Sequence, residues 1–251
     1  MKEIYIERRK KIMDAVGSGV IILFNAPEQT RSRDTQHRYR HDSNFYYLSG
    51  FIEPESIILL VAGAKSKAIL FCREKNPELE LWDGIRTGPK KAADIHGFDE
   101  AYPINQFRKK LPSFIKNRNV FFDMGTHNIW DETIMNAVRT IHAKSKRKNE
   151  SPKSICDIKN IIFEMRLIKD SHELNIMRRA AEISSDAHKR AMLYVKPGLY
   201  EYQVEAEILH EFNKHGCQAP AYTSVVASGK NSCILHYIEN SDQLKNGELL
   251  L

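Results

Sequence analysis

Short apolar runs mark four positions in the first half of the chain where buried strands are expected. Each run is rich in Val, Ile, Leu or Phe, which is typical of strands inside a sheet. The runs are Gly19–Phe24, Ser56–Ala62, Ala68–Cys72 and Asn119–Asp123. Apolar residues also recur with helical spacing between and around these runs. The helical segments are Ile6–Val16, Ile104–Lys116 and Glu132–Ala143. Strands that alternate with helices predict an α/β sheet with helices packed against it.

A polar and charged segment, Lys144–Pro152, interrupts this pattern. It has no apolar periodicity, and we therefore expect a linker here. The linker divides the chain into a first domain over residues 1–150 and a second domain over residues 151–251. The chain of 251 residues is long enough for two domains of ordinary size with a core in each.

Two long helices are predicted at the start of the second domain. Asp170 and Glu173 have the spacing of a capping box, and an apolar stripe extends the first helix to about Tyr194. The second helix begins near Tyr202 and is terminated by Gly216. Strand-like stretches follow at Thr223–Ala227, Cys233–Tyr237 and Glu248–Leu251. This order predicts an α+β domain in which two helices lead into a sheet.

The composition is that of an ordinary globular protein, with 42% apolar and 28% charged residues. No apolar run approaches the roughly 20 residues that cross a bilayer, and the charged N-terminus lacks the pattern of a signal peptide. The four cysteines lie far apart and form no CxxC pair, which argues against a disulfide framework and a zinc knuckle. We therefore expect a cytoplasmic protein with reduced thiols and no membrane partner.

The positive charge raises the question of a nucleic-acid partner. The formal net charge is +6, and a basic run extends from Lys144 to Lys148. No aromatic residues or groove-reading helix accompany this run, so we interpret it as a solvated loop and expect no nucleic-acid partner.

Two residue spacings resemble metal sites, but neither pattern is complete. His37 and His41 lie four residues apart, yet no Glu accompanies them and the neighbouring arginines would repel a cation. Glu207 and His210 have the Glu-x-x-His spacing of dinuclear helical bundles, which need this motif twice. We interpret this helix as amphipathic, with an acidic solvent-exposed face. The neighbouring residues of that face are Glu201, Glu205 and Glu211.

Motifs for nucleophilic or nucleotide chemistry are missing from the sequence. It contains no GxSxG elbow, no P-loop and no GxGxxG turn. The segment Ser228–Asn231 is too short to cradle a phosphate and is interpreted as a hairpin loop. Residue chemistry alone therefore gives no complete active site.

Four longer stretches show a specific resemblance. They are YRHDSNFYYLSGFIEPESIILL (Tyr39–Leu60), EMRLIKDSHEL (Glu164–Leu174), VKPGLYEYQVEAEILHEFNKHG (Val195–Gly216) and ASGKNSCILHYIEN (Ala227–Asn240). In order and spacing, these stretches resemble the aminopeptidase P family of Xaa-Pro aminopeptidases. The resemblance implies an α/β N-terminal domain of the creatinase/aminopeptidase P type, followed by the first part of an α+β pita-bread domain.

The resemblance implies a hydrolase that removes the first residue of a peptide when proline stands second. Family members hold two divalent ions, usually manganese, in a cluster of two Asp, one His and two Glu, and a metal-bridging hydroxide is the nucleophile. The first of these Asp residues lies on the strand that begins here as GELLL, and the others lie further downstream. We therefore expect no metal ligand among these 251 residues, a C-terminally truncated catalytic domain, and little activity of the chain alone.

The resemblance assigns accessory roles to residues that are present. His236 matches a catalytic histidine that contacts the substrate, and Tyr222 matches a tyrosine that supports the metal ligands. Trp82 matches a tryptophan that reaches the substrate site of a neighbouring subunit in tetrameric members, and Arg86 is the counterpart of an arginine that follows it. The implied partners are peptides with proline in second position and, for an intact protein, further copies in a homodimer or homotetramer.

Two alternatives stay open at this point. Pita-bread relatives without metal ligands act as peptide-binding or protein-binding modules. Prolidases, which cleave only dipeptides, and creatinase-like hydrolases share part of the first-half motif. The regions that set substrate length in these enzymes are absent from the sequence, so it does not separate them.

Overall fold

A computed structural model describes residues 2–144 and 150–251. The chain divides into two compact units, Met1–Ile168 and Lys169–Leu251. This division falls later than the boundary that we predicted at residue 150. The reason is that strand β8 (Ser154–Asp157) pairs with strand β7 (Asn119–Phe122), which ties the segment after the predicted linker to the first sheet.

The first unit is built on a six-stranded sheet of described residues with the order β6-β5-β4-β1-β7-β8. The remaining strands of this sheet are β1 (Gly19–Phe24), β4 (Ile57–Ala62), β5 (Lys67–Cys72) and β6 (Glu100–Pro103). Strand β4 is antiparallel to β1 and β5, whereas the other neighbours are parallel. A small hairpin is formed by β2 (Thr30–Ser32) and β3 (Thr35–Gln36).

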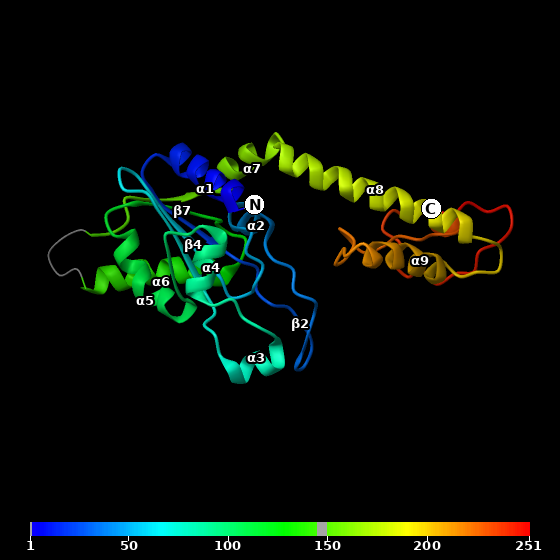
Figure 1. Ribbon diagram of the computed structural model, residues 1–251, viewed down its shortest axis with the longest axis horizontal. Helices are drawn as coiled ribbons and strands as arrows, with labels where there is room; N and C mark the ends of the chain where they lie inside the picture. The colour runs from blue at the N-terminus through cyan, green and yellow to red at the C-terminus, as the bar shows by residue number, and fades with distance from the viewer. Residues whose placement is uncertain (1, 145–149) are drawn as a thin grey trace. The chain divides into compact units, whose positions relative to one another are not determined.

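Helices cover both faces of this sheet (Figure 1). Ile21 and Leu23 of β1 lie in one apolar core, and Val20 and Ile22 lie in the other, as the alternation of side chains along a strand requires. The first core receives side chains from α1 (Lys2–Val16), α2 (Ser43–Ser49), α4 (Pro89–His96) and α7 (Lys159–Leu167). The second receives them from α5 (Phe107–Ile115) and α6 (Asn128–Lys144). The predicted α/β sheet is confirmed.

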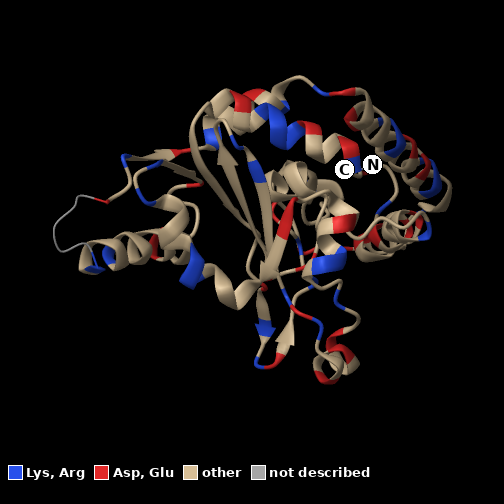
Figure 2. Cartoon of the chain, turned by 60° about the vertical axis from the view of Figure 1, so that its left-hand side comes forward, with Lys and Arg blue, Asp and Glu red and all other residues tan. Residues whose placement is uncertain are grey.

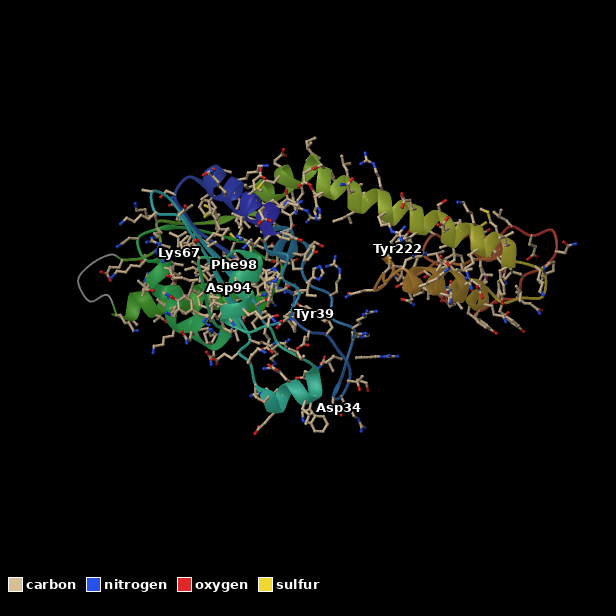
Figure 3. All side chains as sticks on the ribbon, in the orientation of Figure 1. Asp34, Tyr39, Lys67, Asp94, Phe98 and Tyr222 are labelled. Carbon is tan, nitrogen blue, oxygen red and sulfur yellow. The ribbon has the colours of Figure 1, made fainter. Side chains whose placement is uncertain are left out.

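Arg9 of α1 is buried beneath the helices of the first core. Its guanidinium donates to the carbonyl oxygens of Leu48 at 2.8 Å, His96 at 2.8 Å and Gly97 at 2.5 Å. It also lies over the ring of Phe98, which is labelled in Figure 3. Burial lowers the pKa of Arg9 to about 10, so the side chain remains charged near neutral pH. One side chain thereby joins three separate segments of the first unit.

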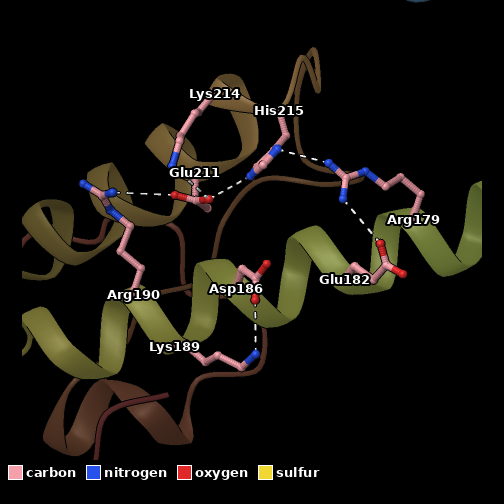
Figure 4. A network of polar contacts seen from close by, with 8 residues as sticks. All are labelled: Arg179, Glu182, Asp186, Lys189, Arg190, Glu211, Lys214 and His215. Atoms are coloured by element: carbon pink, nitrogen blue, oxygen red, sulfur yellow. Dashed lines mark hydrogen bonds and ion pairs between the residues drawn. The ribbon is translucent and has the colours of Figure 1, made fainter.

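The second unit begins with a pair of helices, α8 (Ser171–Tyr194) and α9 (Glu201–Lys214). The capping box of Asp170 and Glu173 and the end of α8 at Tyr194 confirm the predicted first helix. Figure 4 shows polar contacts that join the two helices, among them the ion pair of Arg190 Nη1 with Glu211 Oε2 at 3.6 Å. Arg190 Nε also donates to Glu207 Oε2 of α9 at 2.6 Å.

Three strand predictions in the second unit are wrong. Residues 233–237 begin in the 3₁₀ helix η2 (Gly229–Cys233) and continue through a turn, because the side chain of Tyr237 is anchored to α9. Residues 223–227 and 248–251 form no regular strand in the described chain. They meet at an isolated bridge between Ser228 and Leu250, flanked by a reciprocal pair of backbone hydrogen bonds of 2.8 Å between Ala227 and Leu251.

Basic and acidic positions are interspersed along the described part of the chain (Figure 2). Of the predicted basic loop, only Lys144 is described, so residues 145–149 of that run lie outside the described residues. Within residues 2–144 and 150–251, no helix combines the length and apolar character needed to cross a membrane. All four cysteines are free, and burial raises the pKa of Cys72 to about 12.

Candidate functional site

Glu201, the first residue of α9, is the centre of a buried polar cluster in the second unit. Its side chain is 0% exposed, and its two oxygens accept five hydrogen bonds. Oε1 accepts from the backbone N–H of Ser228 at 2.6 Å, from Ser228 Oγ at 2.8 Å and from Asn231 Nδ2 at 3.3 Å. Oε2 accepts from Tyr237 Oη at 2.7 Å and from the backbone N–H of Asp242 at 2.9 Å. One carboxylate therefore holds both ends of the segment from residue 228 to residue 242.

The hydrogen bonds keep Glu201 ionised despite its burial. Loss of solvation on its own would raise the pKa of this carboxyl group. The donated bonds from Ser228, Tyr237 and Asp242 outweigh that effect and lower the pKa of Glu201 to about 2. Burial and the bond to the Glu201 carboxylate raise the pKa of Tyr237.

Asn240 is a second anchor on the same segment. Its Oδ1 accepts from the backbone N–H of Val226 at 2.9 Å, and its Nδ2 donates to Ser224 O and to Glu205 Oε2, each at 3.0 Å. Asn240 has a φ of 46°, a left-handed conformation that asparagine tolerates better than most residues. The side chain fixes residues 224–226 against the segment that Glu201 holds.

His236 lies on this anchored segment, next to the buried Tyr237. Tyr237 points inward to Glu201, whereas His236 is exposed and forms no hydrogen bond with any described residue. The backbone that carries the imidazole is therefore held firmly while the ring is free to meet a ligand. An exposed imidazole in this setting can donate or accept a hydrogen bond.

The other residues singled out by the sequence are also at the surface, with one exception. Tyr222 is 78% exposed and lies just before the segment that Asn240 holds (Figure 3). Trp82 is 84% exposed on α3 (Pro77–Asp83), a helix that buries none of its residues. Arg86 is the exception, because it is largely buried.

The described residues do not fit a metal ion. Nowhere in this part of the chain are three or more His, Cys, Asp or Glu side chains grouped as ligands. The ring of His41 packs at a tilt of 33° against Tyr46 with ring centroids 4.5 Å apart, and burial lowers the pKa of His41. Glu207 is paired with Arg190 instead of a metal.

The prediction of an acidic, solvent-exposed face on α9 is wrong for Glu201 and Glu211. Both are buried. Glu211 Oε1 lies 2.9 Å from His215 Nε2, and Glu211 Oε2 lies 3.6 Å from Arg190 Nη1 (Figure 4). Burial would raise the pKa of Glu211, but the bond from His215 and the nearby cations lower it. Sequence reasoning missed Glu201 and Asn240 as anchors, because nothing local to them distinguishes a buried acceptor from an exposed one.

Comparison with known proteins identifies relatives along almost the whole chain. Residues 5–122 match the family described as aminopeptidase P, N-terminal domain, and residues 175–251 match metallopeptidase family M24. The Xaa-Pro aminopeptidase of Escherichia coli K12 is 36% identical over 248 residues, which are 97% of this chain and 56% of that protein. Xaa-Pro aminopeptidase 3 of Homo sapiens is 33% identical over 98% of this chain and 51% of its own length.

A solved structure shows the same fold. The aminopeptidase PepP of Pseudomonas aeruginosa superposes with a TM-score of 0.97 at 42% identity, over 100% of this chain and 57% of that one. The chain thus spans little more than half the length of each of these relatives.

Proposed function

The chain belongs to the aminopeptidase P family, and from this premise we propose that the protein acts as an Xaa-Pro aminopeptidase, which hydrolyses the bond between an N-terminal residue and a following proline. The proposal is supported by relatives of that name from a bacterium and from man, each matched across both units. These relatives also favour an aminopeptidase over the prolidase-like alternative.

One observation carries the proposal on this chain. His236 is presented at the surface by a segment that is fixed through Tyr237 and Glu201. In the proposed reaction, the imidazole hydrogen-bonds to the peptide substrate at the scissile bond and positions it. The buried anchor limits the movement of this contact, which is what a positioned catalytic group requires.

Tyr222 and Trp82 have supporting roles in the proposal. Tyr222 would support the metal ligands, and its exposed ring leaves the hydroxyl accessible for that contact. Trp82 would reach the substrate site of another copy in a homodimer or homotetramer. Its near-complete exposure on a helix that buries none of its residues is consistent with such a contact.

The metal pair, which we propose to be manganese, does not fit the described residues of this chain. In the proposal its ligands come from outside these 251 residues, and the chain alone has little activity. A cytoplasmic location is also proposed, which the four free cysteines support.

A fusion protein tests the proposed function. The 251-residue chain would be joined to the part of the Pseudomonas aeruginosa aminopeptidase that it does not cover, and incubated with Mn²⁺ and a Xaa-Pro tetrapeptide. We expect release of the first residue from this peptide and not from a matched Xaa-Ala peptide. His236→Ala is expected to lower kcat/KM at least tenfold. A stable fusion that binds the Xaa-Pro peptide without cleaving it would favour a binding module, and cleavage of dipeptides alone would favour a prolidase.

The unfused chain is the matched comparison. Calorimetric titration with Mn²⁺ is expected to show no tight stoichiometric binding, and the peptide assay is expected to show little turnover. Tight binding of two ions together with turnover would contradict the proposal that the metal ligands lie outside these 251 residues.

A further inference from the structure

Two largely buried arginines in the first unit form no hydrogen bond with any described residue. Arg73 follows β5, and Arg86, which is 9% exposed, lies between α3 and α4. The Nε atoms of both are buried without a partner. Each guanidinium has one long ion pair of 3.6 Å, from Arg73 to Glu53 and from Arg86 to Asp83. A guanidinium carries five donors, and buried donors without acceptors are costly.

The nearby carboxylates do not satisfy these donors. Oε1 of Glu53 accepts from the backbone N–H of Thr87 at 2.8 Å and from its hydroxyl at 2.5 Å. Oε2, the oxygen that faces Arg73, lies 3.6 Å from Nη2 and is itself buried without a hydrogen-bond partner. This distance is too long for a hydrogen bond, so Glu53 balances the charge of Arg73 without accepting from its N–H groups. The side chain of Asp83 is 56% exposed, so water solvates it and weakens its pairing with Arg86. The two guanidinium groups therefore retain donor capacity for another acceptor.

Both arginines line the same pocket, which has a volume of about 330 Å³. This volume is in the range of small-molecule sites. Lys75 and Asn76 add further donors to its wall. Glu55 and Glu74 also line it, but both are exposed and free to turn their carboxylates to water, whereas the arginines are held by burial. The charged groups that are held in place in the pocket wall are therefore the two guanidinium groups, which bind carboxylate or phosphate oxygens.

An apolar groove adjoins this pocket. Glu55, Ile104 and Asn105 line both the pocket and the groove, which has a volume of about 530 Å³. Four buried residues supply apolar surface to the groove, namely Phe24, Ile57, Phe107 and Trp130. The groove lies beyond the carboxyl end of β1, which is the edge where open α/β sheets bind ligands.

We propose that the first unit binds a small organic acid, whose carboxylate or phosphate is held by Arg73, Arg86 and Lys75 and whose apolar body lies in the adjoining groove. The planar guanidinium groups suit either oxyanion, because both offer paired acceptor oxygens. This site lies entirely in the first unit and does not depend on the proposed peptidase activity.

NMR titration of the full 251-residue chain tests the proposal. The probes are acetate, phenylacetate, inorganic phosphate and phenyl phosphate, added at low ionic strength to ¹⁵N-labelled protein. We expect saturable shifts of the backbone amides near Arg73, Arg86 and Asn105. The phenyl compounds are expected to bind about tenfold more tightly than acetate and phosphate, because the ring leaves water. A preference for the carboxylates or for the phosphates identifies which oxyanion the ligand carries.

Matched variants separate the site from general charge effects. Arg86→Gln is expected to weaken binding at least tenfold, and Lys75→Gln, at the exposed rim, a few-fold. Arg139→Gln removes one positive charge from an exposed position on α6 and should leave binding unchanged. If Arg86→Gln fails to fold, the few-fold loss of binding expected for Lys75→Gln still tests the site, because Lys75 is exposed.

Two results would overturn the proposal. One is the absence of saturable shifts at these amides with all four probes. The other is that Lys75→Gln and Arg86→Gln bind phenyl phosphate and phenylacetate with the same affinities as the control variant Arg139→Gln. Equal binding of acetate and phenylacetate would refute the assignment of the groove to the apolar body.

Discussion

The hydroxyl of Tyr237 donates a hydrogen bond of 2.7 Å to Oε2 of Glu201, and both side chains are buried. Their positions in the sequence are 36 residues apart. The bond connects the start of α9 with the segment on which His236 is exposed. Its strength therefore bears on the stability of the second unit and on the position of the proposed catalytic histidine.

Replacement of Glu201 by Gln should destabilise the second unit. An amide nitrogen at one of the two oxygen positions would face donors that it cannot satisfy, with an expected cost of about 2–3 kcal/mol. Chemical denaturation followed by circular dichroism measures the loss. Glu182→Gln on the exposed surface of α8 is the matched control and should change stability by less than about 0.5 kcal/mol. Equal stability of the two variants would contradict the role of Glu201 as an anchor.

Removal of the Tyr237 hydroxyl tests the same bond from its other end. Tyr237→Phe leaves Oε2 of Glu201 with the Asp242 N–H as its remaining donor, and we expect a loss of about 1–2 kcal/mol. Amide hydrogen exchange at Asp242 and Ser228 should accelerate. Tyr222→Phe removes the same hydroxyl from an exposed ring and should leave both quantities unchanged. Unaltered exchange in Tyr237→Phe would show that the bond does not hold the segment.

The depressed pKa of Glu201 predicts a pH dependence of stability. The folded value of about 2 lies below the value of 4.5 that applies to an unperturbed Glu. The unfolded chain therefore binds the proton more readily, and the stabilising contribution is complete above about pH 4.5 and is lost as the pH falls toward 2. Denaturation midpoints measured across this range should fall more steeply for the unmodified chain than for Glu201→Gln. Parallel slopes would rule out this linkage.

Much of the first unit could be predicted because its central strands are buried on both faces. The runs at β1, β4, β5 and β7 are almost uninterrupted apolar sequence, which is a strong signal. Strands β6 (EAYP) and β8 (SICD) were missed, since they lie at the sheet edges and carry polar residues. Their pairing is decided by neighbours that are distant in sequence.

The second unit shows where local patterns mislead. The apolar letters of residues 233–237 predicted a strand, yet Ile234 and Leu235 are exposed and the backbone turns. The sequence predicted Glu201 on the exposed acidic face of this helix, whereas the residue is the first of α9 and is buried. Acidic residues are favoured in the first turn of a helix on electrostatic grounds alone, so its type does not reveal the buried role. Its donors come from 27 to 41 residues further along the chain. No local pattern contains that information.

Arg9 provides the last prediction, in the first unit. Arg9→Met would fill a similar volume but leave the carbonyl oxygens of Leu48, His96 and Gly97 without their buried donor. We expect a loss of about 2–4 kcal/mol, because several backbone acceptors lose a charged partner together. Lys10→Met on the same helix changes an exposed residue and should cost less than about 0.5 kcal/mol. If the two variants unfold at the same denaturant concentration, Arg9 does not join α1 to its neighbours, and apolar packing alone holds this face of the sheet.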